Sequence, residues 1–252
     1  MAQEVIEQET IEVGEFGSIV AGEATSWAPG SFPMPDGGSW VYQEPNATVV
    51  IQNGGLIVSA VPFTRSNDHV QFFDNAKHMY FGVRPFGAPE GGKLTLEWEQ
   101  AARIVGAKPG DLYDGFVSFH LLDLARGVAV NFFVGNDEFA TVYAHLPFPG
   151  TTAPQRAKGP KFFCWFDEKL GLEPGAFHKY SICYDRAAGS LAWSHQGELV
   201  KRVEGVGELG PFTLALGLMT EKDIVPGKGS ASCHGQGAVG KWRNIRAIVE
   251  QA

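Results

Sequence analysis

Hydrophobic residues occur along this chain in short runs, separated by clusters of Gly, Pro, Asn and Asp. Residues 47–60, ATVVIQNGGLIVSA, carry β-branched residues on both sides of Asn53-Gly54-Gly55, which predicts a hairpin. Other runs rich in β-branched and aromatic residues also predict strands. They lie at residues 69–82, 93–105, 114–123, 127–135, 138–146, 161–166, 177–203, 210–219 and 240–250.

No segment keeps a sustained helical period, and the nearest to one, LTLEWEQAARIVG at residues 94–106, does not separate a polar from an apolar face. Because a strand must bury its apolar face on another layer, many short strands predict an all-β fold, an antiparallel two-sheet β-sandwich. Sandwiches of this size are commonly one domain, and no linker divides the 252 residues. We therefore predict a single domain over residues 1–252, with residues 1–25 as an N-terminal strand or arm.

Charge and composition exclude several kinds of partner. The formal net charge of −8, without a basic stripe, argues against a nucleic-acid or anionic-membrane partner. The N-terminal residues lack the basic and apolar regions of a signal peptide, and no apolar run is long enough to cross a membrane, so we expect a cytoplasmic protein. Cys164, Cys183 and Cys233 form no CxxC pair, which favours buried thiols over a disulfide framework or a zinc site. We expect neither a cofactor nor a metal, and the sequence leaves the oligomeric state open.

The segment FHKYSICYDRAAGSLAWSHQGELVKRVEG resembles the strand meander of concanavalin A-like lectins and glucanases. It matches that meander at His178, Tyr180, Ile182, Tyr184, Trp193, Gly197 and Val200. PFTLALGLM and KWRNIRAIVE are similar to the two later strands of glycoside hydrolase family 16. The resemblance covers about residues 40–250 and implies a concanavalin A-like jelly roll with a concave ligand groove.

In family 16 the catalytic strand reads E-I-D-I-E-F-x-G, and its two-residue spacing places three carboxylates on one strand face. The corresponding VAVNFFVG has Val128, Val130 and Phe132 at those positions. A shift by one residue would present Ala129, Asn131 and Phe133, again without an acid. The nearby Asp123, Asp137 and Glu138 are predicted to lie at turns, so the resemblance does not carry hydrolysis over to this chain.

If Val128, Val130 and Phe132 line the groove, its floor is apolar and suits a bulky hydrophobic small molecule better than a sugar. The other interpretation, that they are ordinary core, remains open at this point. Polar residues of neighbouring strands would complete the site, although the strand phase is not fixed by the sequence. The candidate catalytic residues are His120, Tyr143 and His145, because His and Tyr transfer protons or orient a carbonyl near neutral pH. The candidate substrate-binding residues are Ser118, Val128, Val130, Phe132, Thr141 and Trp165.

Two further groups of residues carry potential metal-ligating or acidic side chains. His69, Asp74 and His78 do not have a recognised ligand spacing, so no metal is expected there. Glu97 and Glu99 share a strand face and are the alternative carboxylate pair, although a solvent-facing strand explains them as well.

These residues lead to two functional hypotheses. Stand-alone sandwiches without the glycosidase acids resemble accessory enzymes of polyketide-type natural-product and antibiotic biosynthesis. That resemblance implies a cofactor-independent cyclase, cycloaddition or rearrangement (isomerase-type) enzyme acting on a hydrophobic small molecule, largely by restricting its conformations. The alternative is a carbohydrate-binding or vestigial family 16-like protein.

Overall fold

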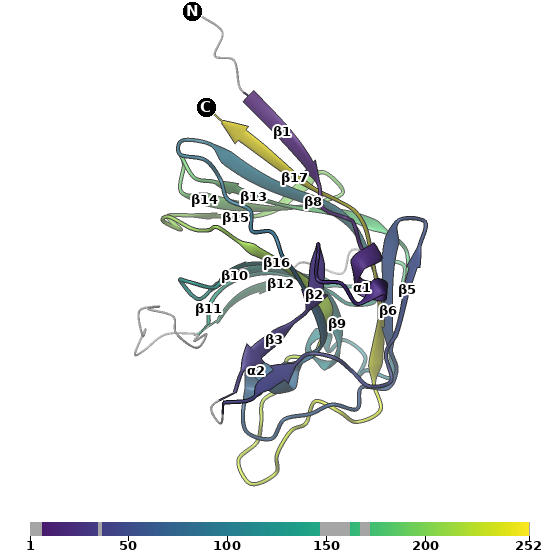
Figure 1. The fold of residues 1–252 in the computed structure, drawn as a ribbon. Helices are drawn as coiled ribbons and strands as arrows, with labels where there is room; N and C mark the ends of the chain where they lie inside the picture. The colour runs from purple at the N-terminus through teal and green to yellow at the C-terminus, as the bar shows by residue number, and fades with distance from the viewer. Residues whose placement is uncertain (1–6, 35–36, 147–161, 167–171, 252) are drawn as a thin grey trace, which may run out of the picture.

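The computed structural model describes residues 7–34, 37–146, 162–166 and 172–251, and for residues 162–166 it describes the backbone only (Figure 1). Strands dominate these residues, with three short helical segments among them. In chain order the elements are β1 (Glu7–Glu12), α1 (Gly17–Ala21), β2 (Trp27–Pro29), β3 (Ser31–Pro33), β4 (Ser39–Val41), β5 (Thr48–Gln52), β6 (Gly55–Ala60), α2 (Gln71–Asn75), β7 (Ala76–Gly82), β8 (Lys93–Val105), the 3-10 helix η1 (Leu112–Asp114), β9 (Phe116–Asp123), β10 (Val128–Val134), β11 (Phe139–His145), β12 (Phe162–Phe166), β13 (His178–Asp185), β14 (Ser190–His195), β15 (Glu198–Glu204), β16 (Thr213–Met219) and β17 (Gly237–Gln251).

Two antiparallel sheets form the layers of a sandwich, which confirms the predicted fold class (Figure 1). Sheet A has eight strands in the order β15-β14-β13-β8-β17-β6-β5, with β1 paired to β17. Sheet B has seven strands in the order β12-β11-β10-β9-β16-β7-β2, and β3 pairs with β4 in a separate hairpin. The neighbouring strands described in both sheets are antiparallel, as expected for strands that each bury one face on the opposite layer.

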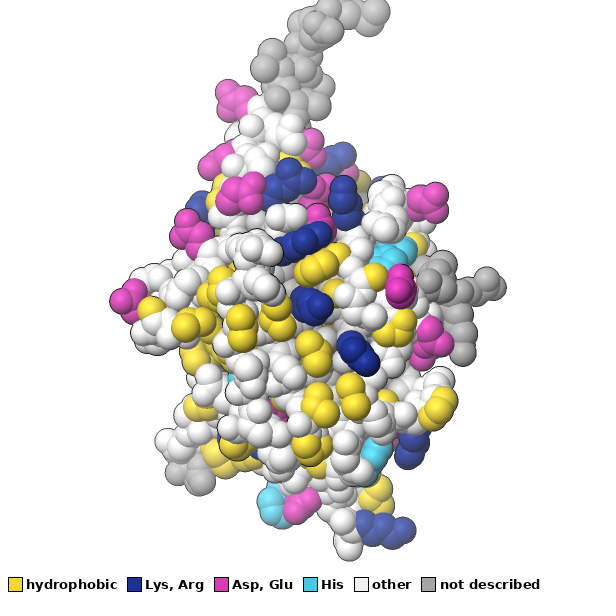
Figure 2. Space-filling model, turned by 90° about the vertical axis from the view of Figure 1, so that its right-hand side faces the viewer, with side chains coloured by type: hydrophobic (Ala, Val, Ile, Leu, Met, Phe, Trp, Pro, Cys, Tyr) yellow, Lys and Arg dark blue, Asp and Glu magenta, His cyan; other side chains and the backbone are white. Residues whose placement is uncertain are grey.

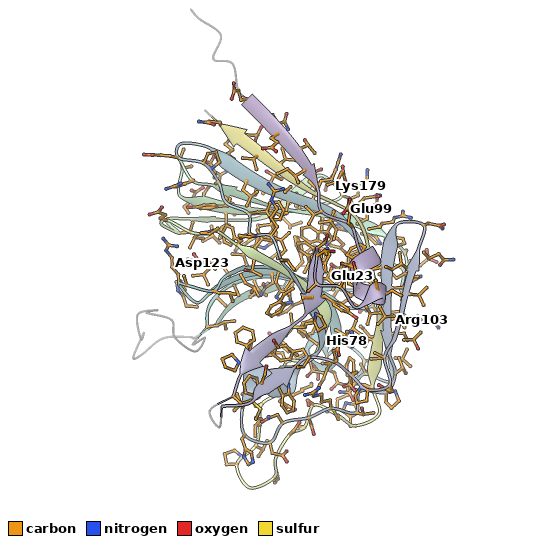
Figure 3. The ribbon with its side chains drawn as sticks, viewed as in Figure 1. Glu23, His78, Glu99, Arg103, Asp123 and Lys179 are labelled. Atoms are coloured by element: carbon orange, nitrogen blue, oxygen red, sulfur yellow. The ribbon has the colours of Figure 1, made fainter. Side chains whose placement is uncertain are left out.

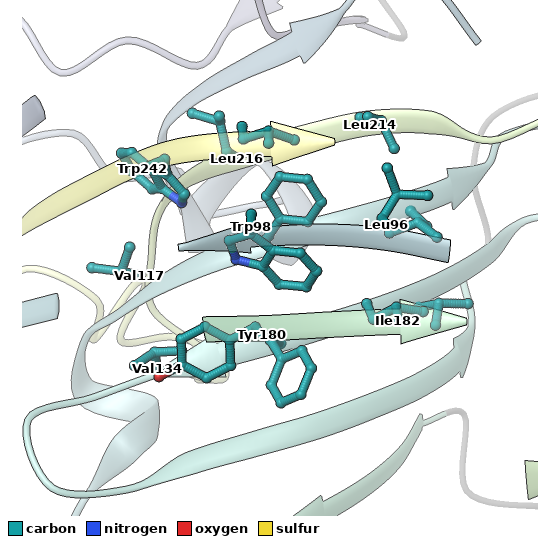
Figure 4. Packing of buried hydrophobic residues seen from close by; sticks show 14 of the residues in the cluster. Leu96, Trp98, Val117, Val134, Tyr180, Ile182, Leu214, Leu216 and Trp242 are labelled. Atoms are coloured by element: carbon teal, nitrogen blue, oxygen red, sulfur yellow. The ribbon is translucent and has the colours of Figure 1, made fainter. Parts of the chain in front are cut away.

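The space between the sheets is filled by large apolar side chains (Figure 4). Trp98 of β8 stacks on Phe119 of β9 with ring centroids 4.1 Å apart and also stacks on Tyr180 of β13. Trp193 of β14 donates its indole N–H to the backbone oxygen of Asn131 in β10, at 3.1 Å, and so joins the two sheets directly. Aromatic packing of this kind stabilises the sandwich through buried area and favourable ring geometry.

The predicted hairpin over residues 47–60 is confirmed as β5 and β6. Asn53 and Gly54 have φ angles of 51° and 74°, the left-handed pair that a tight two-residue hairpin turn requires. The segment 94–106, the nearest approach to a helical period in the sequence, lies almost entirely within strand β8.

The predicted strand at residues 69–82 is wrong in its first half, because Gln71–Asn75 form helix α2 and the strand begins at Ala76. The reason is polar bonding, both just before the helix and between the helix and a distant loop. The side-chain oxygen of Asn67 accepts from the backbone N–H groups of His69 and Val70, which turns the chain before α2. Asp74 lies fully buried, accepts from the hydroxyl groups of Ser230 and Ser232, and fixes the helix against the loop before β17.

A buried ion pair holds the same region. Lys77 and Asp74 have fully buried side chains, with 3.6 Å between Lys77 Nζ and Asp74 Oδ1. The Lys77 ammonium also donates to the Arg65 carbonyl at 2.8 Å and to the Ser232 hydroxyl. The loops before α2 and before β17 are therefore anchored on one charged group.

Sheet B has a second apolar face, which is turned away from sheet A and is called here the outer face of sheet B. The β3–β4 hairpin and α2 pack against it, with Phe32, Tyr42 and Phe73 in the same cluster as Met79 of β7. On the surface of Figure 2, hydrophobic side chains are interspersed with basic ones, and acidic and basic groups gather toward β1. No helix among the described residues is long and apolar enough to cross a membrane.

Candidate functional site

The proposed groove floor of Val128, Val130 and Phe132 is a misassignment, because all three lie between the two sheets. They are 0–1% exposed and share the face of β10 that meets the Trp98 and Tyr180 rings. Side chains alternate along a strand, so a one-residue error in phase moves the whole set to the other face. Of the two interpretations left open by the sequence, these three residues follow the one that made them core.

The outer face of β10 carries Ala129, Asn131 and Phe133, the set expected from the one-residue shift. Neither face of this strand presents a carboxylate. Asp123 does not replace one, because its buried carboxylate accepts from the Arg126 guanidinium at 3.1 Å and from the Gly210 N–H at 2.8 Å. The strand that resembles the family 16 catalytic strand therefore has no paired acids for glycoside cleavage.

Asn131 belongs to a hydrogen-bonded network with Ser118 and His120 of the neighbouring strand β9. His120 Nδ1 lies 2.8 Å from Asn131 Oδ1, and His120 Nε2 lies 2.7 Å from Ser118 Oγ. With the amide oxygen facing Nδ1, that nitrogen carries the proton, and Nε2 accepts from the serine hydroxyl. We refer to Ser118, His120 and Asn131 as the relay.

The relay is buried, with exposed fractions of 0% for Ser118, 4% for His120 and 2% for Asn131. Burial lowers the pKa of His120 to about 4, against the smaller opposing effect of the hydrogen bond to Asn131. The imidazole is therefore neutral at physiological pH and acts as a hydrogen-bonding group rather than as a cation.

Small and aromatic side chains surround the relay on the outer face of sheet B. On β16, Ala215 pairs with His120 and Gly217 pairs with Ser118, so no bulky side chain stands on that side. On the other side the Phe133 ring meets the His120 ring edge-on, with centroids 5.9 Å apart. The apolar residues of the same cluster on β9, β10, β11 and β16 are Phe116, Leu122, Ala129, Phe133, Ala140, Val142, Ala144, Ala215 and Met219.

The predicted catalytic trio His120, Tyr143 and His145 does not come together. Tyr143 and His145 alternate with the outer-face residues of β11 and lie on the side that faces sheet A, whereas His120 lies on the outer face. The Tyr143 hydroxyl and His145 Nε2 lie 3.2 Å apart and form their own pair. The predicted trio combined residues of two strands whose side chains at these positions point to opposite faces of sheet B.

The remaining predicted binding residues divide in the same way. Ser118 lies in the relay, whereas Thr141 is fully buried on the face of β11 toward sheet A. The Thr141 hydroxyl has no hydrogen-bond partner among the described residues. Trp165 pairs with Thr141 in the backbone register of β12, and its side chain lies outside the described part of the structure.

In the other candidate groups the side chains are separated from one another or already bonded to other residues. His78 is buried on β7, where its Nδ1 accepts from the Glu44 N–H, while Asp74 is held by serines. Across the described residues no cluster of three or more His, Cys, Asp or Glu has the geometry of a metal site. Glu97 and Glu99 lie on the outer side of sheet A, opposite the relay, and each accepts from an arginine.

Asn131 is the relay member that sequence reasoning did not single out. A signal was present, because Asn131 is the one polar residue in the buried strand VAVNFFV, and a buried polar side chain requires a partner. Its partner His120 could not be identified without the register between β9 and β10.

Comparison with known proteins agrees with this fold. A family model described as a family of unknown function (DUF6081) matches residues 13–251, and comparison with curated proteins gives no match. Among solved structures, a prokaryotic β-1,3-1,4-glucanase (lichenase) from a mouse hindgut metagenome is 13% identical, with a TM-score of 0.55, covering 96% of this chain and 98% of that one. The Bacillus licheniformis β-glucanase is 13% identical with a TM-score of 0.56, covering 99% and 100%. The catalytic domain of an endo-1,3-β-glucanase (laminarinase) from Thermotoga petrophila is 14% identical with a TM-score of 0.57, covering 98% and 100%.

At these identities the likeness to glucanases concerns the fold, as the resemblance to family 16 implied. The family model covers nearly the whole chain. The chain belongs to the DUF6081 family.

Proposed function

We propose that this protein is a vestigial, non-hydrolytic relative of the family 16 glucanase fold that binds a largely apolar small molecule at the outer face of sheet B. The observation that supports this proposal is the relay itself. A Ser–His–Asn network joins β9 to β10, the strand on which the resemblance places the glycosidase acids, and it is surrounded by Ala, Gly and Phe.

Glycoside hydrolysis requires two carboxyl groups that flank the scissile bond, one as acid and one as nucleophile or base. Ala129, Asn131 and Phe133 supply neither group. The amide of Asn131 can hold a neutral partner by hydrogen bonds but does not attack a sugar carbon.

The ligand class follows from the balance of polar and apolar groups. The relay offers a few polar atoms, already bonded to one another, amid apolar side chains. A sugar would leave many hydroxyl groups without partners there, at a cost of about 1–3 kcal/mol for each. An apolar molecule with one carbonyl or hydroxyl would bond at Ser118 or His120, and each 100 Å2 of its apolar area would contribute roughly 2.5 kcal/mol.

Acyl transfer through Ser118 is disfavoured although the network resembles a nucleophile–base–amide arrangement. Ser118 lies inside β9 between β10 and β16, so the adjacent backbone N–H groups point into the sheet ladders and do not form an oxyanion hole. The reaction proposed for this face is cofactor-independent ring closure or rearrangement of a polyketide-type precursor. In it the face restricts the substrate's conformations and His120 or Ser118 orients its one polar group.

A thermal-shift screen tests the proposal, because a ligand that binds the native state raises the unfolding temperature. The panel contains lipophilic molecules with a single carbonyl or hydroxyl and, separately, soluble oligosaccharides. We expect stabilisation by members of the first group, loss of that stabilisation in His120→Phe, and retention in Lys93→Gln, a change on sheet A away from this face. No release of sugar from β-1,3-1,4-glucan is expected.

The second candidate, carbohydrate binding at the same face, is favoured by the likeness to glucanases. Stabilisation by oligosaccharides alone, abolished by His120→Phe, would replace the first candidate by this one. Glucan cleavage by the purified protein would overturn the non-hydrolytic proposal itself.

A further inference from the structure

An open cavity of about 480 Å3 lies on the outer side of sheet A, on the opposite layer from the relay. Its lining comes from four strands (β1, β8, β13 and β17) and the turn between β14 and β15, so it crosses the sheet rather than following one strand. The lining residues are Glu12, Glu97, Trp98, Glu99, Lys179, Tyr180, Ser181, Gly197, Asn244 and Arg246. Figure 3 shows Glu99 and Lys179 close together at this side of the molecule, and the register pairs them directly across β8 and β13.

An irregularity in β17 accounts for the hollow. The pairing of β17 with β8 shifts register between Arg243 and Arg246, and Asn244 within this bulge has a φ of 52°. Before the bulge β17 pairs with β6, and after it β17 pairs with β1, which ends at Glu12. The change of neighbour leaves a depression whose walls are polar side chains.

The polar groups of this cavity are held in fixed positions. Glu99 accepts from Asn244 Nδ2 at 2.9 Å and from Arg243 Nη2 at 2.6 Å, and Glu97 accepts from Arg246 Nη2 at 2.8 Å. Burial acts to raise the pKa of Glu99, but the hydrogen bonds from Asn244 and Arg243 outweigh it and hold that pKa below its usual value. The Glu99 carboxylate is therefore an ionised acceptor rather than the protonated acid of a glycosidase, and the Glu97 carboxylate is engaged by Arg246.

The charges of the cavity balance. The lining has three acidic side chains, Glu12, Glu97 and Glu99, and two basic ones, Lys179 and Arg246. Arg243, which is ion-paired with Glu99, supplies the third positive charge, so neither an anion nor a cation is favoured. An apolar ligand is also disfavoured, because it would cover these charged groups without replacing their hydration. A matching ligand is uncharged and carries donors and acceptors along its whole length.

We infer that this cavity binds a short, neutral, polyhydroxylated chain, an oligosaccharide, without cleaving it. Vicinal hydroxyl groups donate to the carboxylates of Glu97 and Glu99 and accept from Lys179, Arg246 and Ser181, because a hydroxyl group both donates and accepts hydrogen bonds. The volume lies within the range of about 300–1,000 Å3 that is typical of small-molecule sites. This inference does not depend on the ligand proposed for sheet B.

Saturation-transfer NMR and calorimetry with a panel of neutral linear oligosaccharides test it. We expect weak binding by the wild-type protein and a loss of at least about tenfold in Ser181→Trp, whose indole would fill the cavity from β13. Lys179→Gln should weaken binding by a smaller factor. Lys93→Gln is the matched control, because Lys93 pairs with Asp185 on the same sheet face but does not line the cavity.

The relay variant His120→Phe should bind the same oligosaccharides with unchanged affinity, which separates this site from the one on sheet B. Three results would overturn the inference. They are the absence of binding by every oligosaccharide, unchanged affinity in a folded Ser181→Trp, or binding of charged peptides in preference to neutral sugars.

Discussion

Substituting Asn131 by leucine removes the acceptor of His120 Nδ1 while keeping a side chain that branches at the same carbon atom. The imidazole N–H would then face apolar surroundings, because His120 is 4% exposed and its ring packs on Phe133. The backbone oxygen of Asn131, which accepts from the Trp193 indole, stays in place. The substitution therefore tests the side-chain bond and not the link between the sheets.

An orphaned buried donor costs about 1–3 kcal/mol of the free energy of unfolding, more than the net value of an ordinary hydrogen bond. His120→Phe should cost a similar amount, because it leaves the Asn131 amide without its partner. In the double variant both polar groups are absent, and the Ser118 hydroxyl still lies 3.2 Å from the Gly217 carbonyl. The double variant should therefore lose less than the sum of the single losses, with a coupling of about 1–2 kcal/mol.

Urea unfolding followed by tryptophan fluorescence measures these differences. With a slope of about 3 kcal/mol per molar, a loss of about 2 kcal/mol lowers the urea midpoint by about 0.7 M. Thr213→Val serves as the control on the same sheet. Single losses that add in the double variant to within about 0.5 kcal/mol would show that His120 and Asn131 do not depend on one another.

Three further predictions concern other parts of the sandwich. Burial lowers the pKa of His120 and of His78 to about 4. Because the unfolded value is about 6.5, the stability from these neutral rings is fully present above pH 6.5 and is lost as the pH falls toward 4. A urea midpoint that does not fall between pH 7 and pH 5, or a slope that His120→Phe does not reduce, would contradict this. Lys77→Met leaves the buried Asp74 without its counter-ion and should cost about 3–5 kcal/mol, whereas Lys228→Met on the exposed loop before β17 should have little effect, as thermal unfolding would show. Trp193→Phe removes the indole donor to the Asn131 carbonyl and should cost about 1–3 kcal/mol, and equal urea midpoints for this variant and the wild type would refute the role given to that bond.

The two-sheet architecture could be predicted from the sequence because its signals are local. The turn at Asn53-Gly54 and the alternation in the meander from residue 177 to residue 203 each specify structure within a few residues. The α2 helix could not be predicted in this way, since Asp74 and Lys77 bond to Ser230 and Ser232, which belong to a loop far away in the sequence. The β3–β4 hairpin was also missed, because three-residue strands carry too little alternation to be recognised.

The candidate site depended on strand phase, which a fully buried strand does not reveal. Every side chain of β10 from Val128 to Val134 is buried, so its composition does not distinguish the face toward sheet A from the outer face. The phase is set by the opposite layer, where Phe132 packs against the rings of Trp98 and Tyr180, and by the need of Asn131 for a polar partner.

A buried polar residue in a strand therefore indicates which face each side chain occupies, whereas the apolar residues do not. The face that carries Asn131 must be the face on which a neighbouring strand presents His or Ser, and on β9 that condition holds for Ser118 and His120 and not for Val117, Phe119 or Leu121. Applied to the sequence, this condition selects the one-residue shift, and the expected site moves from Val128, Val130 and Phe132 to the relay.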